Sequence, residues 1–320
     1  MFQQATSTSD YQVCALAPVK PPLVAFVGAT ATGKTALAIA LAKMLGGEII
    51  NADSMQFYRG MDIGTAKASV DEREGIPHHL LDLYDLQVEA SVATFQTLAR
   101  TTISEVRSRN RVPILTGGSG LYVRAALDTL EFPPTDPDLR HRLAAQVENE
   151  GIAPLVDELQ HVDPVSAQRL QDERRIIRAV EVHRLTGRTF SSYMPTRQYH
   201  PNIPPVVQIG LKIERATLHE RIEQRVYTML EAGWLDEVQH LRTVGLEQAP
   251  TASRAIGYRQ MLDYLAGNLS KQQAIDETIV ATRRFARRQE TWFKADPRVH
   301  WIDPQDDHAL AEILRLVKAS

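Results

Sequence analysis

Short apolar runs alternate with helix-forming segments along much of the chain, a pattern typical of α/β proteins. Residues 23–28 form a continuous apolar run, and residues 34–45 form an apolar helical segment that two glycines at 46–47 end. Further strands are predicted at 48–54, 111–120, 204–213 and, as an edge strand, 298–303. Because helical segments separate these strands, the pattern predicts a parallel sheet covered by helices on both faces.

One charged, helical segment interrupts this alternation. Residues 134–197 carry no strand pattern, and prolines border the segment on both sides. The pattern predicts an all-helical subdomain of residues 134–197, inserted into a core made of residues 21–133 and 198–320. Residues 1–20 are rich in Ser, Thr and Gln, which predicts a flexible N-terminal tail.

The composition is that of an ordinary globular protein. The 320 residues are 43% hydrophobic and 23% charged, and no apolar run reaches the roughly 18 residues of a membrane span. The N-terminus lacks the pattern of a secretory signal, and the single cysteine, Cys14, forms neither an internal disulfide nor a Cys-based zinc site. These features favour the cytoplasm. The net charge of −3 means that a nucleic-acid partner would need a local positive surface.

A phosphate-binding loop follows the first predicted strand. The sequence GATATGKT matches the G-x-x-x-x-G-K-[ST] pattern, in which backbone N–H groups and the next helix N-terminus surround an anion. The Lys34 ammonium would bind terminal phosphate oxygens, and the Thr35 hydroxyl would hold Mg²⁺. The predicted diphosphate-binding residues are Gly28, Ala29, Thr30, Ala31, Thr32, Gly33, Lys34 and Thr35.

The loop indicates a diphosphate with Mg²⁺ and leaves ATP binding open. An ATP-hydrolysing relative would carry an acidic residue at the end of a second apolar strand, whereas the run VPILTGG ends at Thr116 and two glycines. The predicted strand that does end in an acid is EIINADS, which places Asp53 at the edge of the sheet that faces the phosphate loop. Asp53 could hold metal-bound water, act as a base on an acceptor, or cap the next segment.

Seven motifs together resemble the bacterial tRNA dimethylallyltransferases, also called tRNA isopentenyltransferases. The resemblance covers about residues 22–303. In chain order the motifs are GATATGKT (28–35), NADSMQFYRGMDIGTAK (51–67), HHLLDL (78–83), GGSGLY (117–122), RAVEVHRLTG (178–187), SRAIGYRQ (253–260) and TRRFARRQETWF (282–293).

The resemblance implies a reaction as well as a fold. The fold would be a P-loop α/β core with a helical insertion, and the protein a monomer. The reaction would move a dimethylallyl group from dimethylallyl diphosphate to N6 of adenosine 37, beside the anticodon, in tRNAs that read codons beginning with U. Mg²⁺ would assist, and pyrophosphate would leave. The partner would therefore be a tRNA anticodon stem-loop.

The resemblance also assigns individual residues. It implies that Asp53 is the general base and that Arg254, together with Lys34, neutralises the diphosphate. It further implies tRNA contacts by Asp53, Ser54, Met55, Gln56, Ser119, Arg174, Arg175, Ile176, Ile177 and Arg178. Arg283, Arg284, Arg287 and Arg288 add a basic helix face that would also suit RNA, although either basic segment alone is typical of a solvated face.

Three positions depart from the family pattern. Ala29 replaces a proline, while Thr32 replaces a serine and Ser119 a threonine, so both hydroxyls are kept.

Three rival functions remain. The first is an adenylate isopentenyltransferase that acts on free AMP, ADP or ATP, against which the helical insertion and the basic helix argue. A P-loop kinase of a small metabolite and a non-catalytic RNA-binding module are the other two.

Overall fold

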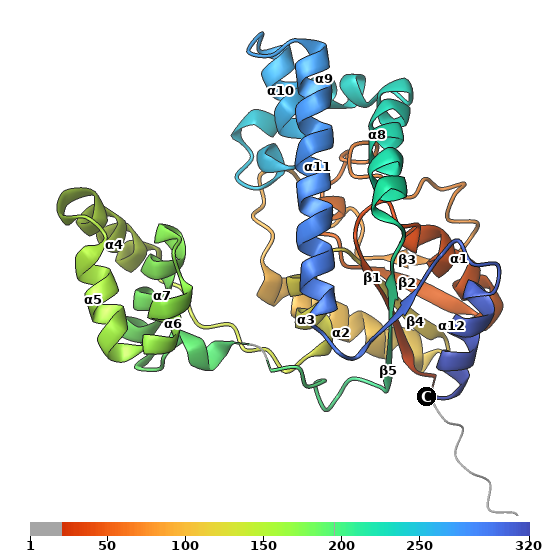
Figure 1. Cartoon of the computed structure of the whole chain (residues 1–320), viewed down its shortest axis with the longest axis horizontal. Helices are drawn as coiled ribbons and strands as arrows, with labels where there is room; N and C mark the ends of the chain where they lie inside the picture. Colours follow the sequence, from red (N-terminus) through yellow and green to blue (C-terminus); the bar gives the residue numbers. More distant parts are fainter. Residues whose placement is uncertain (1–20, 195) are drawn as a thin grey trace, which may run out of the picture.

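The computed structural model describes residues 21–194 and 196–320, and a six-stranded sheet lies at its centre (Figure 1). All strand pairs are parallel, and the order across the sheet is β3-β2-β4-β1-β5-β6. The strands are β1 (Leu23–Gly28), β2 (Gly47–Asn51), β3 (His78–His79), β4 (Val112–Thr116), β5 (Val206–Leu211) and β6 (Val299–Ile302). The predicted parallel α/β sheet is confirmed, with β6 at its edge.

Helices cover both faces of the sheet. On one face α1 (Lys34–Leu45) and α12 (Ala309–Lys318) pack against one apolar cluster. On the other face α2 (Val92–Ser108) and α3 (Gly120–Leu127) pack against a second cluster. Because both faces are covered, the strands are almost continuously apolar, as the sequence pattern indicated.

A helical layer follows β5 and lies above the carboxyl ends of the strands. It consists of α8 (Arg215–Glu231), α9 (Trp234–Thr243), α10 (Tyr258–Leu265) and α11 (Lys271–Lys294), with two short 3₁₀ helices, η3 (Leu246–Gln248) and η4 (Ala252–Arg254). Trp234 and Tyr258 are fully buried in its core, and their ring centroids lie 5.9 Å apart. In Figure 1 the long helix α11 runs from this layer down to the sheet, so its C-terminal part lies beside the carboxyl ends of the strands.

A separate group of helices lies to one side of the core in Figure 1. It consists of α4 (Pro137–Glu150), α5 (Ala153–Val162), α6 (Pro164–Arg169), α7 (Glu173–Thr186) and the 3₁₀ helix η2 (Phe190–Tyr193), and it has an apolar cluster of its own. These helices fall within the all-helical segment predicted at 134–197. Whether the segment is an independent domain with these boundaries stays a prediction.

The two connections to this helical insertion meet at the edge of the core. Asp128 and Tyr199 form an isolated β-bridge, and the Thr129 N–H donates to the carbonyl of Gln198 at 2.9 Å. Arg298 binds both carboxylate oxygens of the buried Asp128, at 2.7 and 3.0 Å, and stacks 4.4 Å above the Tyr199 ring. The insertion is thus anchored to the core through charge and stacking.

The tail predicted for residues 1–20, including Cys14, lies outside the described residues. Within the part of the chain that the structure describes, no helix combines the length and the apolar character needed to cross a membrane.

Candidate active site

A cleft of about 1250 Å³ opens at the carboxyl ends of the strands. Its walls come from the phosphate loop, the turn after β2, the loop at 62–74, the turn after β4 and the helix α8. In an open parallel sheet this is the edge at which ligands bind. The cleft therefore gathers segments that are far apart in the sequence.

The phosphate loop connects β1 to α1 and is fixed by its own hydrogen bonds. Gly28 has a φ of 124°, and a Cβ there would lie 3.0 Å from the Leu211 carbonyl oxygen, so the loop needs glycine at this position. The Thr32 hydroxyl and the Lys34 ammonium both donate to the carbonyl of Ala29, at 2.9 and 2.5 Å. Because Gly33 precedes α1 without a capping side chain, the first N–H groups of α1 are left to bind an anion.

Asp53 lies two residues after β2, and the structure confirms one of the three roles considered above, that of a cap. Its carboxylate accepts the N–H of Met55 at 3.0 Å and so caps the 3₁₀ helix η1 (Ser54–Phe57). The same side chain lines the cleft. This cap is also why β2 ends at Asn51, earlier than the strand predicted at 48–54.

Three charged groups share the floor of the cleft. Burial raises the pKa of Asp53, while the Met55 N–H and the cations of Lys34 and Arg225 oppose that rise. Burial also lowers the pKa of Lys34 to about 8; Arg225 adds to this lowering, and Asp53 opposes it. A carboxylate and two cations are therefore close enough to influence one another.

Arg225 is a site residue that the sequence interpretation missed. It lies on α8, and its guanidinium is 3.4 Å from the Thr30 hydroxyl in the phosphate loop. Burial lowers its pKa, and the Asp53 carboxylate opposes that shift. The one available signal was positional, because a helix that follows a parallel strand starts at the edge where the phosphate loop lies.

Arg254, which the resemblance named for this role, lies elsewhere. It ends the 3₁₀ helix η4, its side chain is exposed, and it is not among the residues that line the cleft. Of the two arginines, Arg225 is the one that contacts the phosphate loop in this structure. A diphosphate contact by Arg254 stays a prediction.

Gln289, on α11, joins the two glycine-rich turns of the cleft. Its side-chain oxygen accepts the Thr30 N–H at 2.9 Å, and its side-chain nitrogen donates to the Gly118 carbonyl at 3.0 Å. The amide is buried, and a Cβ on Gly118 would lie 2.1 Å from its nitrogen. Gln289 is thus a second residue of the site that no motif assignment singled out.

The residues predicted to surround the target base are only partly in the cleft. Gln56 lines it, as Asp53 does, whereas Ser54, Met55 and Ser119 are half-buried and lie outside its lining. Ser119 begins α3, directly after the glycine turn at 117–118. Their contacts with tRNA stay predictions.

The basic residues predicted to bind tRNA divide into two groups. Five have exposed side chains, on α7 and α11; these are Arg174, Arg175, Arg284, Arg287 and Arg288. By contrast Arg283 binds Glu223 on α8 at 2.7 Å. Ile176 and Ile177 are packed in the apolar cluster of the insertion, so their side chains are not available to RNA.

Arg178 is also engaged within the protein. Its guanidinium donates to the carbonyls of Pro133 and Pro134, at 2.8 and 2.9 Å, and to Glu181 at 2.7 Å. The ion pair with the fully buried Glu181 lies within α7 and orients the guanidinium, and the two bonds to the proline carbonyls fix α7 against the incoming connection. The structure therefore gives Arg178 a structural role in addition to the tRNA contact predicted for it.

The residues of the cleft fit a hard cation. The Thr35 hydroxyl is exposed in the cleft beside Lys34, which suits a Mg²⁺ ion shared with diphosphate oxygens and water. Across residues 21–194 and 196–320, no three His, Cys, Asp or Glu side chains gather as a metal site. A Mg²⁺ ion would thus depend on the diphosphate for most of its ligands.

Comparison with known proteins finds relatives of one family along nearly the whole chain. The family model described as IPP transferase matches residues 56–296. A tRNA dimethylallyltransferase of Kocuria rhizophila is 55% identical over 302 residues, which cover 93% of this chain and 96% of that protein. One of Pseudarthrobacter chlorophenolicus is 58% identical over 291 residues, covering 91% and 96%.

Solved structures agree. A tRNA isopentenylpyrophosphate transferase of Bacillus halodurans superimposes with a TM-score of 0.69 at 42% identity, covering 94% of this chain and 96% of that one. A eukaryotic dimethylallyltransferase acting on tRNA superimposes with a TM-score of 0.76 at 26% identity, covering 92% and 77%.

Proposed function

This chain belongs to the IPP transferase family, as its motifs predicted, and we propose that it transfers a dimethylallyl group from dimethylallyl diphosphate to N6 of adenosine 37 in tRNA. The substrates would be tRNAs that read codons beginning with U. The observation that carries this proposal is the meeting, in one cleft, of the phosphate loop with the Asp53 carboxylate and the Lys34 and Arg225 cations.

The diphosphate end of the cleft suits the departure of the leaving group. As the allylic C–O bond breaks, its electron pair moves to the diphosphate, whose negative charge rises. Lys34, Arg225 and the first N–H groups of α1 would stabilise that charge, because all of them line or face the cleft. Mg²⁺, when bound through Thr35 and the phosphate oxygens, would neutralise part of the same charge.

Asp53 suits the acceptor half of the reaction. The adenine N6 lone pair forms a bond to C1 of the dimethylallyl group, and N6 loses a proton, which Asp53 accepts. Burial raises the pKa of Asp53 and so makes its carboxylate a stronger base. A positioned base of this kind contributes about 10²–10⁴-fold to rate.

The exposed arginines support a tRNA acceptor over free AMP. Arg174 and Arg175 lie on the insertion, and Arg284, Arg287 and Arg288 lie on α11, so two separate elements expose positive charge. A mononucleotide needs no such surface, whereas an anticodon loop with an extruded base offers many phosphates. Because its acceptor would be tRNA, we also infer that the enzyme is cytoplasmic. The monomeric state stays a prediction.

The test is a mass-spectrometric assay of the purified protein with Mg²⁺ and dimethylallyl diphosphate. One reaction contains unmodified tRNA with adenosines at 36, 37 and 38, and a parallel reaction contains AMP. We expect prenylated adenosine from the tRNA alone. Product on AMP would assign the protein to the nucleotide-acting enzymes, and ATP consumption without prenylated product would contradict prenyl transfer.

A further inference from the structure

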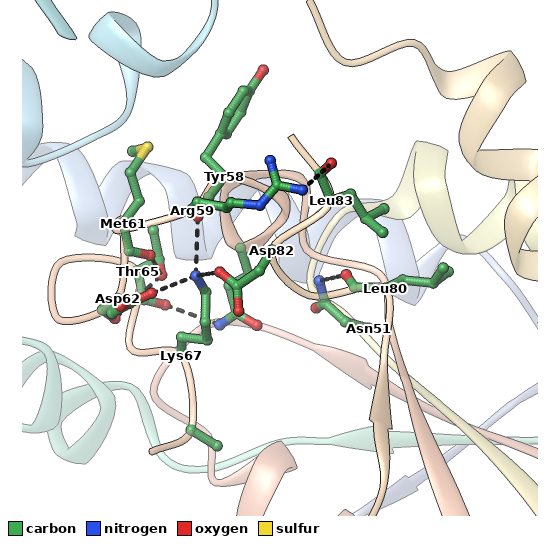
Figure 2. A network of polar contacts seen from close by, with 12 residues as sticks. Asn51, Tyr58, Arg59, Met61, Asp62, Thr65, Lys67, Leu80, Asp82 and Leu83 are labelled. Atoms are coloured by element: carbon green, nitrogen blue, oxygen red, sulfur yellow. Dashed lines mark hydrogen bonds and ion pairs between the residues drawn. The ribbon is translucent and has the colours of Figure 1, made fainter. Parts of the chain in front are cut away.

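Two oppositely charged residues hold one wall of the cleft, the loop at residues 61–67. Figure 2 shows the ammonium of Lys67 among the residues of this loop and its neighbours. We infer that Lys67 and Glu237 are positioning residues, which fix this loop and through it Gln56 and the 3₁₀ helix that Asp53 caps. The inference rests on the proposed function, because its test reads the reaction on tRNA.

Lys67 is buried and ties three segments together. Its side chain is 3% exposed, and its Nζ lies 2.5 Å from Asp62, 2.6 Å from Asp82 and 3.0 Å from the Tyr58 carbonyl oxygen (Figure 2). Asp62 belongs to the loop, Asp82 follows β3, and Tyr58 follows η1 directly. The ammonium thus joins the end of η1 to both flanking loops.

These three partners also exclude a simpler role for Lys67. A lysine in a phosphate-binding cleft would ordinarily be assigned to the ligand. An ammonium has three N–H donors, however, and here each has its own acceptor within the protein. Two carboxylates beside it also offset its charge. Lys67 is therefore equipped to organise the cleft wall, and Lys34 and Arg225 remain for the diphosphate.

Gln56 is the residue through which the loop reaches the site. Its side-chain nitrogen donates to the carbonyls of Thr65 and Ala66, at 3.1 and 3.3 Å. Its backbone carbonyl accepts the N–H of Asp82 at 3.2 Å. Gln56 is thus held by the same two loops that Lys67 joins. Because Asp53 caps the short helix that contains Gln56, a shift of the loop would displace both.

Glu237 holds the other side of the loop from α9. Its carboxylate accepts the N–H groups of Asp62 and Ile63, at 3.0 and 2.7 Å, and that of Gly64 at 3.3 Å. It also accepts the hydroxyl of the buried Tyr258 at 2.5 Å. Glu237 is not among the residues that line the cleft, so it reaches the reaction through the loop.

The loop has little freedom of its own once these contacts are made. A Cβ on Gly64 would lie 2.1 Å from the indole nitrogen of Trp234, so the backbone lies directly on α9. Residues 61–67 form neither a regular helix nor a strand, and their position depends on these side-chain contacts. Loss of either charged residue should therefore loosen the wall without dismantling the sheet.

The experiment compares Lys67→Met and Glu237→Ala with Lys318→Met, an exposed lysine on α12, as the charge-matched control. We expect both test variants to lower kcat/KM for tRNA by about 10- to 100-fold, as misplacement of reacting groups by an ångström does. The affinity for dimethylallyl diphosphate, measured by calorimetry, should change by less than about threefold, because the phosphate loop is untouched. Glu237→Gln, which keeps one acceptor oxygen, should restore part of the rate.

Three outcomes would overturn the inference. Wild-type kinetics on tRNA in either folded variant would show that the loop does not position the site, even if the melting temperature falls. Loss of diphosphate affinity in Lys67→Met would make Lys67 a ligand-binding residue. Equal rates for Glu237→Ala and Glu237→Gln would show that the loss of rate does not come from the hydrogen bonds between Glu237 and the loop. If Lys67→Met fails to fold, the comparison of Glu237→Ala with the near-isosteric Glu237→Gln carries the test. Absence of product from the wild-type enzyme would contradict the proposed function instead.

Discussion

Asp53 combines a structural contact with a proposed chemical one, and one substitution separates the two. Asp53→Asn keeps an oxygen to accept the Met55 N–H, so the 3₁₀ helix stays capped and the protein should fold. The amide cannot take the N6 proton, so single-turnover transfer to tRNA should fall by about 10²–10⁴-fold. A folded Asp53→Asn enzyme with near-normal turnover would remove Asp53 from the role of base.

Lys34 should make donor use depend on pH. With its pKa lowered to about 8 by burial and by Arg225, Lys34 is charged below that pH and neutral above it. We therefore expect kcat/KM for dimethylallyl diphosphate to fall as the pH rises through about 8, since this parameter reports groups of the free enzyme. At low pH the same kcat/KM should fall as Asp53 becomes protonated. Because burial raises the pKa of Asp53, this fall should occur at a higher pH than for an ordinary aspartate.

The control for this profile is Lys34→Arg, whose guanidinium stays charged at every accessible pH. Its alkaline limb should disappear, even if the overall rate is lower because the guanidinium is larger. An alkaline limb that persists unchanged in Lys34→Arg would assign the titration to another group.

Two arginines compete for the role of diphosphate partner, and their positions predict different outcomes. Arg225 lies 3.4 Å from the Thr30 hydroxyl, whereas Arg254 is exposed outside the cleft. Arg225→Gln should lower kcat/KM for the donor by about 10²–10³-fold, the effect of removing one preorganised donor from a developing anion. Arg254→Gln should cost less than about tenfold. The reverse order would support the assignment that the sequence resemblance implied.

Strands and helices could be predicted from the sequence wherever a long run kept a single pattern. The apolar runs that became β1, β4 and β5 are long enough to be recognised alone. In contrast β3 is two histidines, and its place in the sheet depends on pairing with β2, which no local pattern reveals. The strand predicted at 48–54 was too long because Asp53, at its polar end, caps a new turn.

The site was predictable to the extent that it belongs to one strand–helix–strand unit. Lys34 begins the helix of the first strand–helix–strand unit and Asp53 follows the second strand of that unit, so parallel-sheet geometry alone brings them together. Arg225 and Gln289 come from helices that are 195 and 259 residues along the chain from the loop residue they contact. Their placement depends on how α8 and α11 pack, so the sequence pattern could not separate them from other helical polar residues.

Gln289 gives α11 a measurable connection to the phosphate loop. Gln289→Met would leave the half-buried Thr30 N–H and the buried Gly118 carbonyl without this partner, at a cost of about 1–3 kcal/mol in the free energy of unfolding. Affinity for dimethylallyl diphosphate should fall as well, because the loop loses its brace. Gln272→Met, at an exposed position of the same helix, should change neither quantity. Equal unfolding free energies for the two variants would contradict this bracing role.

Taken as a unit, the molecule is slightly acidic but carries positive charge on two of its parts. The net charge is −3, yet α7 of the insertion and the end of α11 both expose arginines. Figure 1 shows the insertion to one side of the core and α11 running down to the sheet. A bound tRNA stem-loop would contact both elements, with its extruded base directed to the cleft. The contacts of Arg298 with Asp128 and Tyr199 would hold the insertion in a fixed position relative to α11.

This arrangement predicts how tRNA binding responds to salt. Each phosphate contact that is lost should reduce the slope of log K against log salt concentration by about one unit. Arg287→Gln with Arg288→Gln should reduce the slope, and Arg174→Gln with Arg175→Gln should do so independently, because the two pairs lie on separate elements. Arg242→Gln removes an arginine that is paired with Glu247 on the surface of another helix, and it should leave the slope unchanged. Filter binding over a range of salt concentrations measures all three slopes. If neither double variant alters the slope, these arginines are solvated surface residues, and the tRNA must be held by a different face of the protein.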